Sequence, residues 1–127
     1  MKRIPSFILA AVMLAVLLLS VSAAGDETGS ITANIRYNKN PVSGLDIDVL
    51  RVAAPNGDGQ YDMTEPFRGL MLEQNGTEPA LTAANANALS NHAGKNNIEG
   101  VKAQTDKTGT VVFSGLAKGI YLVRKTG

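Results

Sequence analysis

The sequence predicts an all-β sandwich interrupted by a helical insertion in the middle of the chain. Three observations support this prediction. Short runs of β-branched and alternating apolar residues occur near both ends of the chain, and clusters of Gly, Asn, Asp and Pro separate them. Between the two groups of strands lies one Ala-rich segment with the composition of a helix. Strands joined by short turns, with a single helix among them, favour two packed sheets.

The first group of strands follows a polar segment at residues 25–29, which we expect to be flexible. Residues 30–37 place Ile31, Ala33 and Ile35 on one face, which is the period of a half-buried strand. Residues 38–44 form a turn cluster. Residues 45–52 again alternate, and Asp46 and Asp48 fall on the second face, which we expect to be wetted by solvent.

The last group of strands lies at the end of the chain. Residues 101–105 form a strand, residues 106–109 a polar turn, and residues 110–113 and 120–123 the two arms of a hairpin. The Gly-bounded segment 114–119 is the loop between those arms. Together with residues 30–52, these strands define one domain over residues 30–127.

The insertion covers about residues 62–98. Residues 53–60 form a loop, residues 61–63 a short strand, residues 65–72 include a helical turn, and residues 79–93 form the main helix. We expect Thr77 to cap this helix and Gly94 to end it. Leu81, Ala84, Ala88 and His92 are spaced to share one face of this helix, with Leu89 beside them, and we expect His92 to be a surface residue near the helix end.

The N-terminus has the pattern of a secretory signal peptide. A basic start, Met1-Lys2-Arg3, precedes an apolar run at residues 7–19 and the small-residue sequence SVSAA at residues 20–24. Cleavage after Ala23 or Ala24 satisfies the preference for small residues. A membrane anchor is the alternative, but a span needs about 20 apolar residues. We therefore expect residues 1–24 to be removed and the mature protein to be secreted.

Charge and cysteine content restrict the classes of function. Lys2 and Arg3 leave with the signal peptide, so ten basic residues face eleven acidic ones and the mature net charge is −1. This net charge does not indicate the basic surface that a nucleic-acid-binding protein needs. The chain contains no Cys, so its stability cannot depend on disulfides.

Three segments resemble the Cna B-type (SpaA-like, prealbumin-like) domains of Gram-positive surface proteins and pilins. GSITANI at residues 29–35 is similar to the first strand of that family, and PVSGLDIDVLRV at residues 41–52 to its turn and second strand. VVFSGLAKGIYLV at residues 111–123 is similar to the F-x-G-L-x-x-G-x-Y-x-V segment of the family. The resemblance spans most of residues 29–123, and the helical segment is an insertion within it.

The resemblance implies an immunoglobulin-like sandwich that serves as a pilin, stalk or adhesin module on a bacterial cell wall. Its partners would be other surface-protein or pilin subunits and host or matrix ligands, with a sortase acting through a C-terminal region not present here. We count fewer strands than the roughly seven of a complete sandwich and expect the domain to be incomplete at its C-terminus. The alternative is a freely secreted module that binds carbohydrate or a host protein.

The family often carries a Lys–Asn isopeptide bond and a sortase-linked lysine, but neither transfers to residues of this chain. The first strand has Arg36 where an amine nucleophile would be needed. Lys39, in Tyr37-Asn38-Lys39-Asn40, lacks the proline of the sortase motif, and we interpret it as a solvated turn lysine. We assign no isopeptide residues.

No catalytic, cofactor-binding or metal-binding residue is assigned, and we predict that the protein is not an enzyme. His92 is the single His, so a zinc site of the usual kind cannot be built. The sequence NGDGQYD at residues 56–62 resembles part of a calcium loop but lacks the closing Glu, and we interpret it as a solvated turn. The absence of a G-x-S-x-G motif disfavours a hydrolase.

Overall fold

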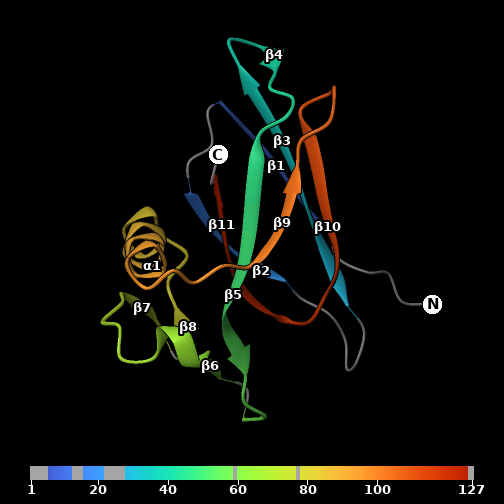
Figure 1. Cartoon of the computed structure of the whole chain (residues 1–127). Helices are drawn as coiled ribbons and strands as arrows, with labels where there is room; N and C mark the ends of the chain where they lie inside the picture. Colours follow the sequence, from blue (N-terminus) through green and yellow to red (C-terminus); the bar gives the residue numbers. More distant parts are fainter. Residues whose placement is uncertain (1–5, 13–15, 22–27, 59, 77, 126–127) are drawn as a thin grey trace, which may run out of the picture.

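Two stacked β-sheets and a helical layer make up the protein. We describe them from a computed structural model, which covers residues 6–12, 16–21, 28–58, 60–76 and 78–125. The predicted all-β sandwich is confirmed at this level, because most described residues in regular structure are strands and a single α-helix accompanies them. Figure 1 shows the strands side by side with helix α1 on one flank.

The first sheet is built around β3 (Gly29–Tyr37). β10 (Thr110–Leu116) pairs with it antiparallel, β1 (Ser6–Val12) pairs with it parallel, and β4 (Asn40–Pro41) joins its far end through a tight turn. Ile31, Ala33 and Ile35 are fully buried, as the alternation in the sequence predicts.

The second sheet has the order β2-β11-β5-β6. β11 (Gly119–Lys125) lies between β2 (Val16–Val21) and β5 (Asp46–Pro55), antiparallel to both. The other edge of β5 is shared by two short strands, which are β9 (Val101–Gln104) at its start and β6 (Tyr61–Met63) at its end.

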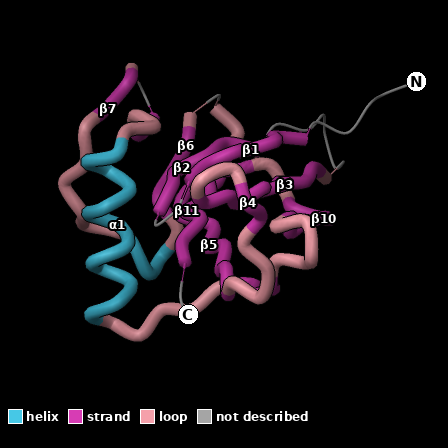
Figure 2. Tube along the Cα trace, turned by 90° about the horizontal axis from the view of Figure 1, so that it is seen from above, coloured by secondary structure: helices cyan, strands magenta, loops and turns pink. Residues whose placement is uncertain are grey.

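Two apolar clusters hold the layers together. The first fills the space between the sheets and includes Ile31 and Ile35 of β3, Phe113 of β10 and Val123 of β11. The second lies on the outer face of the β11–β5 sheet, where Leu50, Val52 and Leu122 meet residues of the insertion. Figure 2, seen from above, shows α1 as a separate layer beside the strands.

The outer face of β5 is therefore dry, and our prediction of a solvated acidic face was wrong. Asp46 is half-buried, but Asp48 is fully buried. The insertion covers this face, so β5 is buried on both sides along most of its length. Alternation in one strand cannot reveal that a distant segment will fold over it.

The predicted hairpin of residues 110–113 and 120–123 is also wrong. Both segments are strands, but β10 pairs with β3 and β11 pairs with β2 and β5, so they belong to different sheets. The register of β10 shifts between Phe113 and Leu116, and Gly115 between them has φ +71. This irregularity, next to the turn before β11, lies where the chain crosses from one sheet to the other.

The insertion contains a 3-10 turn η1 (Glu65–Phe67), a small hairpin of β7 (Gln74–Asn75) and β8 (Glu78–Pro79), and α1 (Ala83–Lys95). The helix begins four residues later than predicted because Pro79 is part of the hairpin. Thr82 is the N-cap and accepts a hydrogen bond from the backbone N–H of Asn85. Thr77, the predicted cap, lies outside the described residues. The buried residues of α1 are Asn85, Ala86, Leu89 and Ala93.

The predicted signal peptide overlaps two strands. β1 and β2 fall within residues 1–24 and extend the edges of the two sheets. The basic start, the predicted cleavage site and residues 25–27 lie outside the described residues. In the part of the chain that the structure describes, no helix has the length and apolar content needed to cross a membrane.

Candidate functional site

A pocket of about 370 Å³ opens beside the middle of β5. It lies where β5 passes from its partner β9 to its partner β6, so that residues 50–52 have no strand beside them on this edge. Gly100 lines the pocket, and a Cβ at this position would collide with the backbone carbonyl of Val49. The lining residues are Val49, Leu50, Arg51, Thr64, Pro66, Phe67, Ile98, Glu99, Gly100, Val101, Gly115, Leu116, Ala117 and Tyr121.

Arg51, Thr64, Glu99 and Tyr121 supply the polar side chains of this pocket. Arg51 donates from Nη2 to the carbonyl of Lys118, while its Nε is buried and has no hydrogen-bond partner among the described residues. The Tyr121 hydroxyl donates to the carbonyl of Ala117 over 2.6 Å. Burial raises the pKa of Tyr121, and the nearby Arg51 charge opposes that shift, so the phenol stays protonated at neutral pH.

This arrangement suits binding better than bond-breaking chemistry. The Thr64 hydroxyl donates to the carbonyl of Arg51 over 2.9 Å, so both pocket hydroxyls are held by backbone carbonyls and neither is paired with a base. The Nε of Arg51 is fully buried, so it does not reach the space of the pocket. Most of the lining is apolar, and Glu99 adds an exposed carboxylate. The pocket thus fits a mainly apolar group.

A buried ion pair is the second polar feature. Asp48 on β5 and Arg124 on β11 are cross-strand partners, and Arg124 Nη2 lies 3.4 Å from Asp48 Oδ2. Gly100 N–H donates to the same oxygen over 3.3 Å, and Arg124 also donates to the carbonyl of Ile98 over 2.9 Å. Through these contacts the pair links residues 98–100, which precede β9, to β5 and β11 in the centre of the sheet. This is a structural role.

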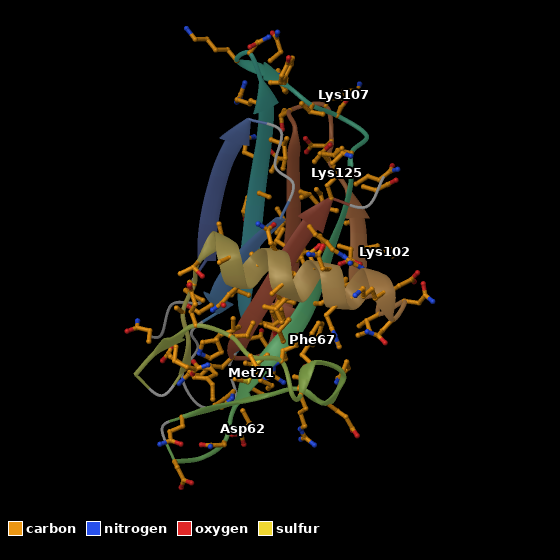
Figure 3. All side chains as sticks on the ribbon, turned by 90° about the vertical axis from the view of Figure 1, so that its left-hand side faces the viewer. Asp62, Phe67, Met71, Lys102, Lys107 and Lys125 are labelled. Carbon is orange, nitrogen blue, oxygen red and sulfur yellow. The ribbon has the colours of Figure 1, made fainter. Side chains whose placement is uncertain are left out.

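His92 joins the helix to the 3-10 turn. Its Nε2 lies 2.7 Å from the carbonyl of Pro66, and its ring is 5.7 Å from the ring of Phe67. Figure 3 shows Phe67 close beneath α1. Nε2 is therefore the protonated nitrogen, and Nδ1 faces the side-chain amide of Asn96. These contacts of His92 link α1 to η1 within the insertion.

The other segments weighed in the sequence analysis lie apart from the pocket. Lys39 is exposed, with φ +67 in the turn between β3 and β4. Asn56 and Asp62 hydrogen-bond to each other over 3.3 Å across their loop. Among the described residues, no group of three or more His, Cys, Asp or Glu side chains is placed to hold a metal ion.

The pocket itself was missed from the sequence. Arg51 sits in the strand pattern as an ordinary polar residue, and the gap in the edge of β5 arises from where β6 and β9 happen to pair. No local motif marks such a gap.

Comparison with known proteins adds no relative: no protein-family model, curated protein or solved structure matches the chain. The resemblance to Cna B-type domains therefore remains a prediction from the sequence motifs.

Proposed function

We propose that the protein is a secreted, non-enzymatic surface module of pilin or adhesin type from a Gram-positive bacterium. The observation that carries this proposal is a leader of signal-peptide pattern followed by a two-sheet sandwich. The Cna B-like motifs of residues 29–52 and 111–123 fall on β3 and β10 of the first sheet and on β5 and β11 of the second. Its fold would be immunoglobulin-like in topology, and its neighbours would be other subunits and host or matrix ligands.

A freely secreted binding module is the second candidate, and the pocket beside Arg51 favours it. Its mainly apolar lining suits a small ligand that has an apolar body. Sugar recognition usually uses exposed aromatic platforms. Of the exposed large apolar side chains among the described residues, only Tyr37 is aromatic, so a carbohydrate is the less suitable ligand.

Fractionation of the native host separates the two candidates. An antibody against residues 25–127 is used on the medium, the membrane and the cell wall. A surface module linked to the wall gives a band, or a ladder of high mass, that survives boiling in detergent and is released only by wall hydrolases. A single band free in the medium, of the mass of residues 25–127, would contradict wall attachment and favour the binding module.

A further inference from the structure

Strand β2 contributes to both apolar clusters. It pairs antiparallel with β11, so that Leu18 lies opposite Leu122 and Leu19 opposite Tyr121. Leu18 is only 5 % exposed and belongs to the cluster beneath α1, whereas Leu19 packs against the cluster between the sheets. Two adjacent side chains of one strand therefore fill opposite faces of the sheet.

The position that β2 occupies beside β11 is enclosed on two sides and is not a bare sheet edge; we call this position the slot. Helix α1 packs over β2 as well as over β11, and β2 also contacts β3 of the opposite sheet. A strand in this position is thus covered on one face by the helix and on the other by the first sheet. Figure 1 shows β2 and β11 together on the side of the molecule that faces α1.

Export would empty this slot. The following step rests on the proposed function, in which residues 1–24 are removed and β2 leaves with them. The backbone of β11 would then lose its partner along residues 119–124, and the apolar surfaces that contact Leu18 and Leu19 would be open. An unpaired edge next to open apolar surface is a template for an incoming strand.

We propose that the slot beside β11 accepts a β-strand donated by a partner polypeptide. The donated strand runs antiparallel to β11 and carries two successive apolar side chains where Leu18 and Leu19 stand. The position of Ser20, opposite Ile120 and half-buried, tolerates a small polar residue. The ligand class is therefore an extended peptide of about six residues that is apolar on both faces.

A second copy of this chain does not fit as the donor. In residues 28–125, the strands with adjacent buried side chains over most of their length are β5 and β11, and both are already paired inside their sheet. A neighbour's β11 would also bring its own α1 and β5, yet α1 already covers the slot. Only a single extended strand can enter.

The test uses the full chain with a specific protease recognition sequence inserted between Ala24 and Gly25. After cleavage, a labelled peptide with the sequence of residues 16–21, flanked by lysines for solubility, is added. The control peptide carries Leu18→Asp and Leu19→Asp. Native mass spectrometry reports stoichiometry, and hydrogen exchange reports protection of the backbone amides of residues 119–124.

We expect the labelled peptide to replace the cleaved leader at one copy per chain and to protect the β11 amides. The control peptide should bind at least about 100-fold more weakly, because it would bury two carboxylates against apolar surface. Aggregation of the cleaved chain that the labelled peptide prevents would also support the proposal.

The proposal is overturned by equal binding of both peptides, by full protection of β11 when neither the leader nor the labelled peptide is bound, or by aggregation that the labelled peptide does not prevent. A stable dimer of the cleaved chain would assign the slot to a second copy and would also overturn it. N-terminal sequencing of the native protein tests the proposed function separately. A start before Val16 would contradict export with leader removal, whatever the peptide result.

Discussion

At the scale of single residues, the ion pair of Asp48 and Arg124 is the contact that we expect to be sensitive to substitution. Asp48 is fully buried, and its one ionic partner in the described part of the chain is Arg124, whose side chain is 13 % exposed. We expect Asp48→Asn to lower the free energy of unfolding by about 3 kcal/mol, because the Arg124 charge is left buried without a counter-charge. Urea unfolding of the full chain measures the loss.

Asp46→Asn is the matched control for this prediction. Asp46 lies on the same strand, is half-buried and accepts a hydrogen bond from Gln104 Nε2 over 2.7 Å. We expect its loss to stay below about 1 kcal/mol. A second variant, Asp48→Leu with Arg124→Leu, should recover much of the stability, since an apolar pair removes both buried charges. Equal losses in Asp48→Asn and Asp46→Asn would contradict the importance of the ion pair.

Asp106 makes stability depend on pH in the acid range. Its Oδ1 accepts from the Thr108 hydroxyl over 2.7 Å, from Thr110 N–H over 3.1 Å and from Thr108 N–H over 2.8 Å. These hydrogen bonds, that from the Thr108 side chain foremost, lower the pKa of the Asp106 carboxyl.

A carboxyl whose pKa is lower in the folded state stabilises the protein above its unfolded pKa of about 3.9. That contribution is lost as the pH falls through the folded value. We therefore expect the wild type to be more stable than Asp106→Asn at pH 7, with the difference shrinking steadily below about pH 4. Urea midpoints from pH 7 to pH 2.5 measure this, and a difference independent of pH would be the contrary result.

The inward residues of β3 and β5 could be predicted from the sequence because a strand has a strict period of two. Ile31, Ile35 and Ile47 are fully buried, as alternation requires. Asp48 could not be predicted to be buried in the same way. Its environment depends on the helical layer, which is separate in sequence and leaves no trace in the pattern of β5 itself.

At the scale of elements, Asn85 fastens helix α1 to the segment before it. It is 2 % exposed, and its Nδ2 donates to the carbonyls of Glu73 and Ala80, while its Oδ1 accepts from Glu73 N–H. We expect Asn85→Ala to cost about 2 kcal/mol, because three backbone groups lose their partner. Asn87→Ala, on the exposed side, should be neutral or slightly stabilising through helix propensity. Thermal unfolding of both variants decides between them.

Substitution of two leucines tests which face of α1 is buried. Leu89 is fully buried, and Leu81, which precedes the helix, is 48 % exposed. We expect Leu89→Ala to lower the free energy of unfolding by about 3 kcal/mol and Leu81→Ala by less than about 1 kcal/mol. Denaturant unfolding gives both values. Similar losses in the two variants would contradict the buried position of Leu89.

The elements that could be predicted from the sequence are those set by local chemistry. β3, β5, β6 and β9 lie within a few residues of their predicted bounds. The helix start was misplaced, because Pro79 is equally suited to a first helical turn and to the edge hairpin that it joins. The pairing of β10 and β11 was wrong because proximity in sequence favours a hairpin, and only the packing of two sheets decides against it.

At the scale of the whole molecule, the pocket could not be predicted because it is formed by four separate parts of the chain. Its walls come from β5, from η1 with Thr64, from residues 98–101 and from the connection between β10 and β11. Each part contributes three or four residues, and none has an unusual composition. The candidate site is a product of topology, whereas the leader pattern and the strand motifs are local and visible in the sequence.

The insertion is the covering layer of the second sheet, and the whole molecule should fail without it. Replacing residues 64–97 by a short Gly-Ser linker removes α1, η1 and the small hairpin. This uncovers Leu50, Val52 and Leu122, which are 3 % exposed or less in the intact protein. Each buried apolar side chain contributes about 1.5–3 kcal/mol, and three neighbouring ones exposed together form an adhesive patch.

We expect this deletion variant to bind a hydrophobic dye and to self-associate in size-exclusion chromatography, while circular dichroism still shows β-structure from the cluster between the sheets. The control shortens the exposed loop at residues 56–58, which contacts neither cluster, and should remain a monomer. A deletion variant that stayed monomeric, with an unchanged unfolding midpoint, would mean that the sandwich is stable by itself and that the helical layer is an appendage. Self-association confined to the deletion variant would instead establish three layers as the stable unit.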